Sequence, residues 1–96
     1  MRIEWDEEKA RRNLTKHGVS FDAAAKVFED PNRITELDWV VDHETRWRTI
    51  GRAGFVTVVF LIHTDETMND QTIVRIISAR KADRYERQAY EQGYLG

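Results

Sequence analysis

The stretch IVRIISARKADRYE, residues 73–86, reads as a buried β-strand that runs into a charged corner and then begins a helix. Its apolar residues are β-branched, as in a central strand with both faces buried: Ile73, Val74, Ile76 and Ile77. Asp83 suits the N-cap of a helix, and Glu86 three residues later completes a capping-box pattern. We therefore expect the strand to end before Arg80 and the helix to follow Asp83.

The charged corner is the first candidate site. Arg80 and Lys81 follow the strand, and Arg84 and Tyr85 follow on the first turn of the helix. A guanidinium binds phosphate through a planar fork, a rigid strand holds that fork in place, and a tyrosine beside it can stack on a base. The alternative is a solvated corner without function.

Arg75 interrupts the apolar run of the same strand. It is either a phosphate ligand or a structural arginine paired with a buried acid, because an unpaired buried charge is too costly. Arg75 and Arg80 lie five residues apart, so a regular strand points them to opposite faces. They serve one site only if a bulge intervenes or if the strand ends before Arg80, and we expect the second.

The preceding segments predict the rest of a single α+β domain over residues 1–96. By apolar period and capping residues, helices are expected over 7–16 and 21–29, and strands over 33–41, 45–52 and 55–63. Residues 3–5 form a short strand at most, and the polar residues 65–70 predict a loop. Hairpin-length connections make the expected four-stranded sheet mainly antiparallel, with two helices before it and one helix after it that ends at Gly93.

Alternation along residues 45–52 places three arginines on one face of that strand: Arg46, Arg48 and Arg52. They form either a cationic stripe for phosphates or an ordinary solvated face, since arginine usually lies outside.

The histidines do not predict a metal site. His17, His43 and His63 are 26 and 20 residues apart, which matches no metal-ligand motif. His17 suits the C-terminal end of the first helix, and His63 is expected to face solvent at the end of its strand. An imidazole is also a natural general base, so His17 stays a catalytic candidate beside Lys81 and Tyr85.

The amino-acid composition excludes some kinds of site and favours a small domain that can contact RNA. The 96-residue chain has no cysteine, which excludes disulfides and zinc–thiolate sites. Its net charge is −2. Residues 71–96 carry five basic and three acidic side chains, a local net of +2, which suits contact with RNA but not tight binding of long duplexes by charge alone. The chain has no membrane-length apolar run and no signal-peptide core at residues 1–6, which favours the cytoplasm.

Short motifs along nearly the whole chain resemble the BrnT family, the ribonuclease half of a bacterial type II toxin–antitoxin pair. The C-terminal signature is Arg75 to Ala82, followed by Glu86 and Tyr90. The N-terminal motifs are Glu4-Trp5-Asp6, Lys9, Asn13, Lys16 to Phe21, Ala24, Val27-Phe28 and Asp30-Pro31. A middle motif is Glu44-Thr45-Arg46-Trp47 with Ile50-Gly51.

The resemblance implies a RelE-like fold and an endoribonuclease without cofactors. Removal of the 2′-OH proton lets that oxygen attack the adjacent phosphate, and cations stabilise the extra charge of the transition state. The residues expected in that role are Arg80, Lys81, Arg46 and Arg75, with His17, Lys81 or Tyr85 as base or acid and with Arg48, Arg52 and Arg84 binding RNA. The implied partner is a BrnA-like antitoxin that binds DNA through a ribbon-helix-helix-type domain.

A different class stays open at this point. An inactive homologue would keep the partner surface and act only with the antitoxin in repression of its own operon. Such a module would have no need of the basic cluster at residues 80–84, which this chain retains.

Overall fold

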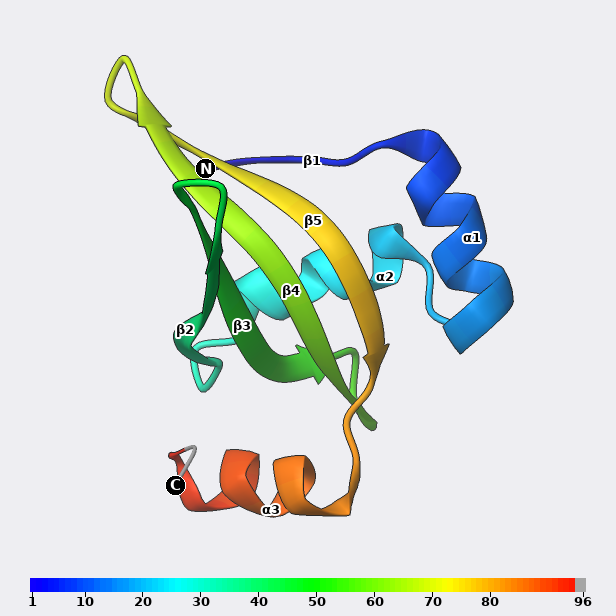
Figure 1. Ribbon diagram of the computed structural model, residues 1–96. Helices are drawn as coiled ribbons and strands as arrows, with labels where there is room; N and C mark the ends of the chain where they lie inside the picture. Colours follow the sequence, from blue (N-terminus) through cyan, green and yellow to red (C-terminus); the bar gives the residue numbers. More distant parts are fainter. Residues whose placement is uncertain (95–96) are drawn as a thin grey trace.

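The computed structural model describes residues 1–94 and shows an α+β fold with three α-helices and one five-stranded mixed sheet (Figure 1). In chain order the elements are β1 (Arg2–Glu4), α1 (Glu7–His17), α2 (Phe21–Ala25), the 3-10 helix η1 (Lys26–Glu29), β2 (Ile34–Val41), β3 (Glu44–Ala53), β4 (Thr57–Met68), β5 (Gln71–Lys81) and α3 (Arg84–Gln92). Within the described residues, no helix is long and apolar enough to cross a membrane.

The predicted four-stranded sheet has one strand too few, and the sheet is mixed, although three of its four strand pairs are antiparallel as expected. The strand order is β1-β5-β4-β3-β2, and β1 pairs in parallel with β5, with Ile3 opposite Val74. The other three neighbouring pairs are antiparallel hairpins. A three-residue strand carries too little periodicity to be assigned from sequence, and its partner lies at the other end of the chain.

Two strand boundaries also differ from the prediction. β4 begins at Thr57 and continues to Met68, so residues 65–70 form a hairpin rather than a loop. Its turn is Asn69-Asp70, both with positive φ, as a two-residue type I′ turn requires. Polar residues are tolerated there because this end of the β4–β5 ribbon projects beyond the helices and neither face is buried (Figure 1).

The helices begin and end largely as their caps predict. Asp6 caps α1, and Gly18 ends it in the left-handed conformation. The predicted helix over 21–29 is wrong in its second half, where α2 gives way to the 3-10 helix η1. The N-terminal helices pack on one face of the sheet, whereas α3 lies across the far end of the strands (Figure 1).

The core lies between the sheet and the N-terminal helices. Its fully buried members come from both layers: Val19, Phe21, Ala24, Val27, Val59, Leu61, Ile76 and Ala79. We call this side of the sheet the helix face. The opposite side, which α3 covers only at one end, is the open face.

Two β-bulges decide which residues point to the open face. In β2 the register shifts between Leu37 and Trp39, and in β5 it shifts so that Ile77 has no partner. The expectation that β5 ends before Arg80 is wrong, because the strand continues through Lys81 and the bulge sets the direction of Arg80.

Candidate active site

A pocket of about 690 Å³ lies on the open face, where α3 meets the sheet. Each of the four long strands contributes one side chain to it, and α3 contributes three: Glu36, Arg48, Phe60, Arg80, Tyr85, Glu86 and Ala89. The strands form a rigid floor, and the charged side chains stand on it. Such a frame suits a site that must hold its groups in fixed positions.

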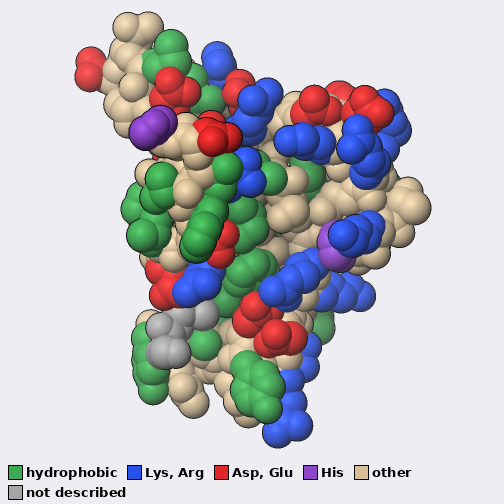
Figure 2. All heavy atoms as spheres, in the orientation of Figure 1, with side chains coloured by type: hydrophobic (Ala, Val, Ile, Leu, Met, Phe, Trp, Pro, Cys, Tyr) green, Lys and Arg blue, Asp and Glu red, His purple; other side chains and the backbone are tan. Residues whose placement is uncertain are grey.

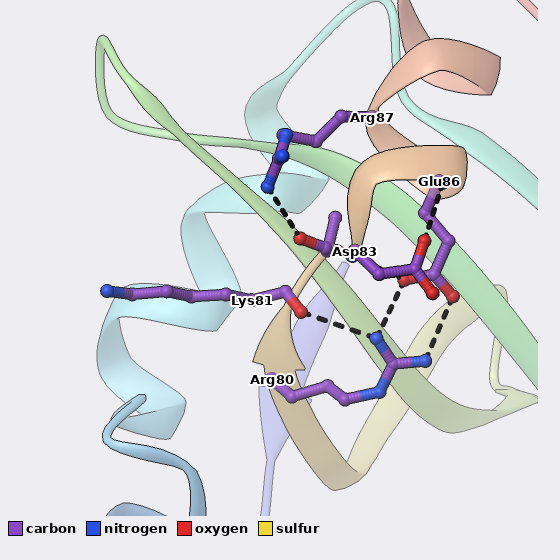
Figure 3. A network of polar contacts seen from close by, with 6 residues as sticks. Arg80, Lys81, Asp83, Glu86 and Arg87 are labelled. Carbon is purple, nitrogen blue, oxygen red and sulfur yellow. Dashed lines mark hydrogen bonds and ion pairs between the residues drawn. The ribbon is translucent and has the colours of Figure 1, made fainter.

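Arg80 is held by four contacts, one of which is a hydrogen bond from its Nη1 to the carbonyl oxygen of Lys81 at 3.3 Å. Its Nη1 and Nη2 donate to the two carboxylate oxygens of Glu86 at 2.7 and 2.9 Å (Figure 3). Its guanidinium lies 4.2 Å from the ring centre of Phe60. The hydrogen bonding of the guanidinium to Glu86 is the main reason that the pKa of Arg80 is raised above its usual value. Arg80 therefore stays charged in a fixed orientation, which a phosphate-binding fork needs.

Glu86 also takes part in the capping box at the start of α3, so it connects this helix to the pocket. Its side chain accepts a hydrogen bond from the backbone N–H of Asp83, and the Asp83 side chain accepts one from the N–H of Glu86. This capping box confirms the predicted start of the helix. The residue that begins α3 thus also orients Arg80.

Arg48 and Glu36 form a second pair on the same floor. They are direct cross-strand partners in the β2–β3 hairpin, and Arg48 donates from Nε to Glu36 Oε1 at 2.6 Å and from Nη2 to the same oxygen. The pocket thus holds two guanidinium groups and two carboxylates. Tyr85, on its rim, is 76% exposed and free to meet a ligand.

Lys81 does not join Arg80. The two residues are consecutive on a strand, so their side chains point in opposite directions, and Figure 3 shows Lys81 extending away from the Arg80–Glu86 pair. His17 also lies elsewhere, in a groove between α1 and β5.

The other predicted arginines are dispersed. Arg46 lies further along β3, where its buried Nε has no hydrogen-bond partner among the described residues and lies 3.7 Å from Glu44 Oε1. Arg75 is exposed in the middle of β5, so the reading of a buried, paired arginine is wrong there. Arg52 borders a separate pocket beside Tyr90, and Arg84 is exposed on the first turn of α3. Of the predicted residues, the pocket gathers Arg80, Arg48 and Tyr85.

Four pocket residues are not among the site residues predicted from the sequence: Glu36, Phe60, Glu86 and Ala89. The sequence predicted Phe60 only as part of a hydrophobic strand and Glu86 only as a capping residue, and it gave Glu36 no role. The alternation of Glu36 with Asp38, facing a strand of alternating arginines, was an available signal. This signal does not identify the partner of Glu36 without the register of the β2–β3 pair, because the bulge at Asp38 shifts that register by one residue.

The prediction that His63 faces solvent is wrong, because this residue is only 1% exposed and lies on the helix face. Its Nδ1 lies 2.9 Å from Asp65 Oδ1, and its Nε2 lies 2.6 Å from Thr49 Oγ1. The Thr49 hydroxyl is in turn 2.7 Å from Thr35 Oγ1. Both nitrogens of the His63 ring therefore have hydrogen-bond partners, and the ring lies on the opposite face of the sheet from the open-face pocket.

We expect the free energy of unfolding to fall as the pH drops below about 6.5, the value for an unfolded histidine. Burial, the largest influence, lowers the pKa of His63, and Asp65 opposes it only in part. Below 6.5 the unfolded chain therefore binds a proton that the folded chain excludes until its own lower pKa is reached. One such group gives a slope of at most about 1.4 kcal/mol per pH unit.

Urea denaturation at pH 7.5, 6.5 and 5.5 measures this slope. His63→Gln should flatten it, whereas His43→Asn, in the exposed β2–β3 turn, should keep it. An equal slope in wild type and His63→Gln would assign the pH dependence to other groups.

The fold and the pocket together define a small α+β protein whose sheet carries paired arginines and glutamates under a C-terminal helix. The family model described as ribonuclease toxin BrnT of type II toxin–antitoxin systems matches residues 5–86. The chain therefore belongs to the BrnT family, which confirms the resemblance seen in its motifs.

A solved structure agrees with this fold. The crystal structure of the Brucella abortus ribonuclease toxin BrnT matches with a TM-score of 0.62 and 24% sequence identity, and the match covers 88% of this chain and 99% of that one. At this identity the likeness shows the fold alone. The search of curated proteins gives no match.

Proposed function

We propose that this chain is an endoribonuclease toxin that cleaves RNA at the open-face pocket by attack of the 2′-OH, without a metal ion. The observation that carries the proposal is the convergence of Arg48 and Arg80, from two different strands, on one pocket with an aromatic floor and rim. Guanidinium forks bind phosphate, and aromatic rings stack on bases.

Arg80 is the main phosphate ligand in this proposal. RNA carries its own nucleophile, so the protein has to supply charge stabilisation, a base and an acid. The guanidinium of Arg80, held between Glu86 and Phe60, faces the negative charge that develops on the phosphate. Arg48 adds a second cation from across the pocket.

Glu36 is the base that the pocket offers. Two of the three residues that the sequence predicted for proton transfer, His17 and Lys81, lie outside the pocket, whereas the Glu36 carboxylate lies within it. Its Oε1 is engaged by Arg48, and among the described residues no hydrogen bond engages its Oε2. That oxygen takes the 2′-OH proton, the 2′-oxygen attacks phosphorus, and a 2′,3′-cyclic phosphate forms as the 5′-oxygen leaves.

Tyr85 completes the reaction as the proton donor. Its exposed phenol on α3 stands at the mouth of the pocket, where the leaving 5′-oxygen would exit. Donation of the phenolic proton to that oxygen balances the proton taken by Glu36. The same ring stacks on a neighbouring base while the RNA is bound.

A second candidate function is the inactive binding module. The observation in its favour is that both pocket arginines are already paired with carboxylates, as structural arginines would be. In either case membership of a type II toxin–antitoxin family implies a protein antitoxin. We infer a BrnA-like antitoxin with a ribbon-helix-helix-type domain, DNA contact only through that partner, and action in the cytoplasm, where the RNA substrate is.

We expect the purified protein to cleave RNA in excess EDTA and to leave 2′,3′-cyclic phosphate ends. In the described residues, no cluster of three or more histidine, aspartate or glutamate side chains could hold a metal ion, and the proposed steps use only protein groups. End analysis of a labelled RNA measures both properties. Activity that vanishes with EDTA and returns with Mg²⁺ would contradict the metal-independent mechanism.

Induced expression without an antitoxin separates the two candidate functions. Growth arrest with RNA decay supports the ribonuclease. Normal growth at a confirmed level of folded protein supports the binding module.

A further inference from the structure

A second cationic site lies beside the edge of β5 that faces α1. A groove of about 270 Å³ runs between α1 and β5, and its lining is Lys9, Arg12, Asn13, Lys16, His17, Ile77 and Ser78. No acidic residue belongs to this lining in the part of the chain that the structure describes. Neither the open-face pocket nor the core makes use of these cations.

The charge of α1 changes along the helix, because its acidic residues, Glu7 and Glu8, lie in the first turn and its basic residues follow them. Residues 9–17 contain four lysine and arginine side chains and one histidine, and no carboxylate. Lys9, Arg12 and Lys16 follow one another at the i, i+3 and i+7 spacing of a single helix face. Figure 2 shows Lys and Arg side chains gathered over α1, at the right of the view, with a histidine among them.

These cations are largely unneutralised. Arg12 pairs with Glu8 at 3.1 Å, but both side chains are about two-thirds exposed, at 70% and 67%, so the pair is weak. Lys9 and Lys16 form no ion pair within 4 Å among the described residues. On a chain with a net charge of −2, this helix face is a local cationic field.

The groove adjoins the proposed active site along one strand. Ser78 lines the groove and Arg80 lines the pocket, and two residues along a strand span about 7 Å. β1 pairs only with residues 73–75 of β5, so the edge of β5 at Ile77 and Ser78 carries no neighbouring strand. A flexible polyanion can therefore pass from the pocket over this edge to α1.

We propose that the groove between α1 and β5 binds the phosphate backbone of the RNA nucleotides that flank the cleaved bond. The proposal rests on the ribonuclease function proposed above. Lys9, Arg12 and Lys16 contact phosphates, and the Ser78 hydroxyl adds a hydrogen bond. Contacts of this kind position the strand without reading its sequence, so the groove raises affinity for longer RNA and leaves the chemical step to the pocket.

The test compares two double variants that each remove two exposed charges. Lys9→Gln with Lys16→Gln alters the groove, and Arg2→Gln with Lys26→Gln alters exposed positions that do not line it. Binding of a 2′-O-methyl RNA 12-mer, which lacks the nucleophile, is measured by fluorescence anisotropy between 50 and 200 mM salt. Cleavage of a dinucleotide and of a 12-mer is measured in parallel.

We expect the groove variant to bind the 12-mer about tenfold more weakly at low salt and to lower the salt slope by about 1.4, since each phosphate contact on a single strand contributes about 0.7. Its kcat/KM for the dinucleotide should stay at the wild-type value, whereas its KM for the 12-mer should rise. The control variant should match wild type in each measurement, and the melting temperatures should agree.

Three results would overturn the proposal. One is an equal loss of binding in the control variant, and another is an unchanged salt slope in the groove variant. The third is normal RNA binding with lost neutralisation by the antitoxin, which would assign this face to the protein partner. Absence of cleavage in the wild type would overturn the ribonuclease proposal alone, because the uncleavable 12-mer reports on the groove separately.

Discussion

Arg80→Ala is expected to lower the rate of RNA cleavage by about 10²–10³, the usual loss when one transition-state donor is removed. The guanidinium lies between Glu86 and Phe60 at the edge of the pocket, where it can follow the charge on the phosphate. Because that charge grows in the transition state, RNA binding should weaken less than the cleavage rate. Arg80→Lys should also be poor, since an ammonium cannot reproduce a fork.

The structure supplies a control for this prediction. Glu86→Gln breaks the ion pair with Arg80 but keeps the capping box, which accepts glutamine as well as glutamate. If Arg80 only anchors α3, Arg80→Ala and Glu86→Gln should behave alike, each losing about 1 kcal/mol of stability with normal turnover. If Arg80 binds phosphate, Glu86→Gln, whose amide oxygen can still accept a hydrogen bond from the guanidinium, should lose much less cleavage than Arg80→Ala.

Single-turnover cleavage at matched concentrations of folded protein distinguishes these cases, with thermal unfolding measured for each variant. Near-wild-type turnover of Arg80→Ala would remove Arg80 from the site. Arg48 would then be the remaining guanidinium in the pocket.

Asn13→Ala is expected to cost about 3 kcal/mol of unfolding free energy, because three hydrogen bonds disappear and buried backbone groups lose their partners. The Asn13 amide donates to the carbonyls of Val19 and Ala79 at 3.0 and 2.7 Å, and its oxygen accepts from the N–H of Ala79 at 3.1 Å. It thereby takes the place of a neighbouring strand beyond the end of β1.

For a chain of this size the loss corresponds to a fall in melting temperature of roughly 15 °C. Thr15→Ala, at an exposed position of the same helix, should change the melting temperature little. A fall of only a few degrees for Asn13→Ala would mean that water or backbone movement replaces the lost contacts. The variant should still cleave RNA when folded, since Asn13 lies outside the open-face pocket.

Much of the local structure was determined by the sequence. Asp6 and Gly18 bound α1, and Asp83 with Glu86 begins α3, because capping uses the side chains of the residues beside it. The turn at Asp42-His43 and the alternation of Arg46 and Arg48 along β3 are local in the same sense. The family motifs were likewise readable, since they lie along one continuous chain.

Only the tertiary structure decided which residues meet in the pocket. If β4 and β5 paired from the turn at Asn69-Asp70 without a bulge, Arg80 would lie opposite Val59 and point into the core. The bulge at Ile77 instead pairs Arg80 with Phe60, so its side chain points to the open face. If β2 and β3 paired from the turn at Asp42-His43 without a bulge, Glu36 would lie opposite Thr49. The bulge at Asp38 instead pairs Glu36 with Arg48.

The physical reason is the period of a strand. Side chains alternate with period two, so one inserted residue moves every later side chain to the other face. Where the insertion falls depends on the packing of both faces of the sheet at once. Caps and turns depend on a few adjacent residues and are visible in the sequence, whereas the two bulges that assemble Glu36, Arg48 and Arg80 depend on partners distant along the chain.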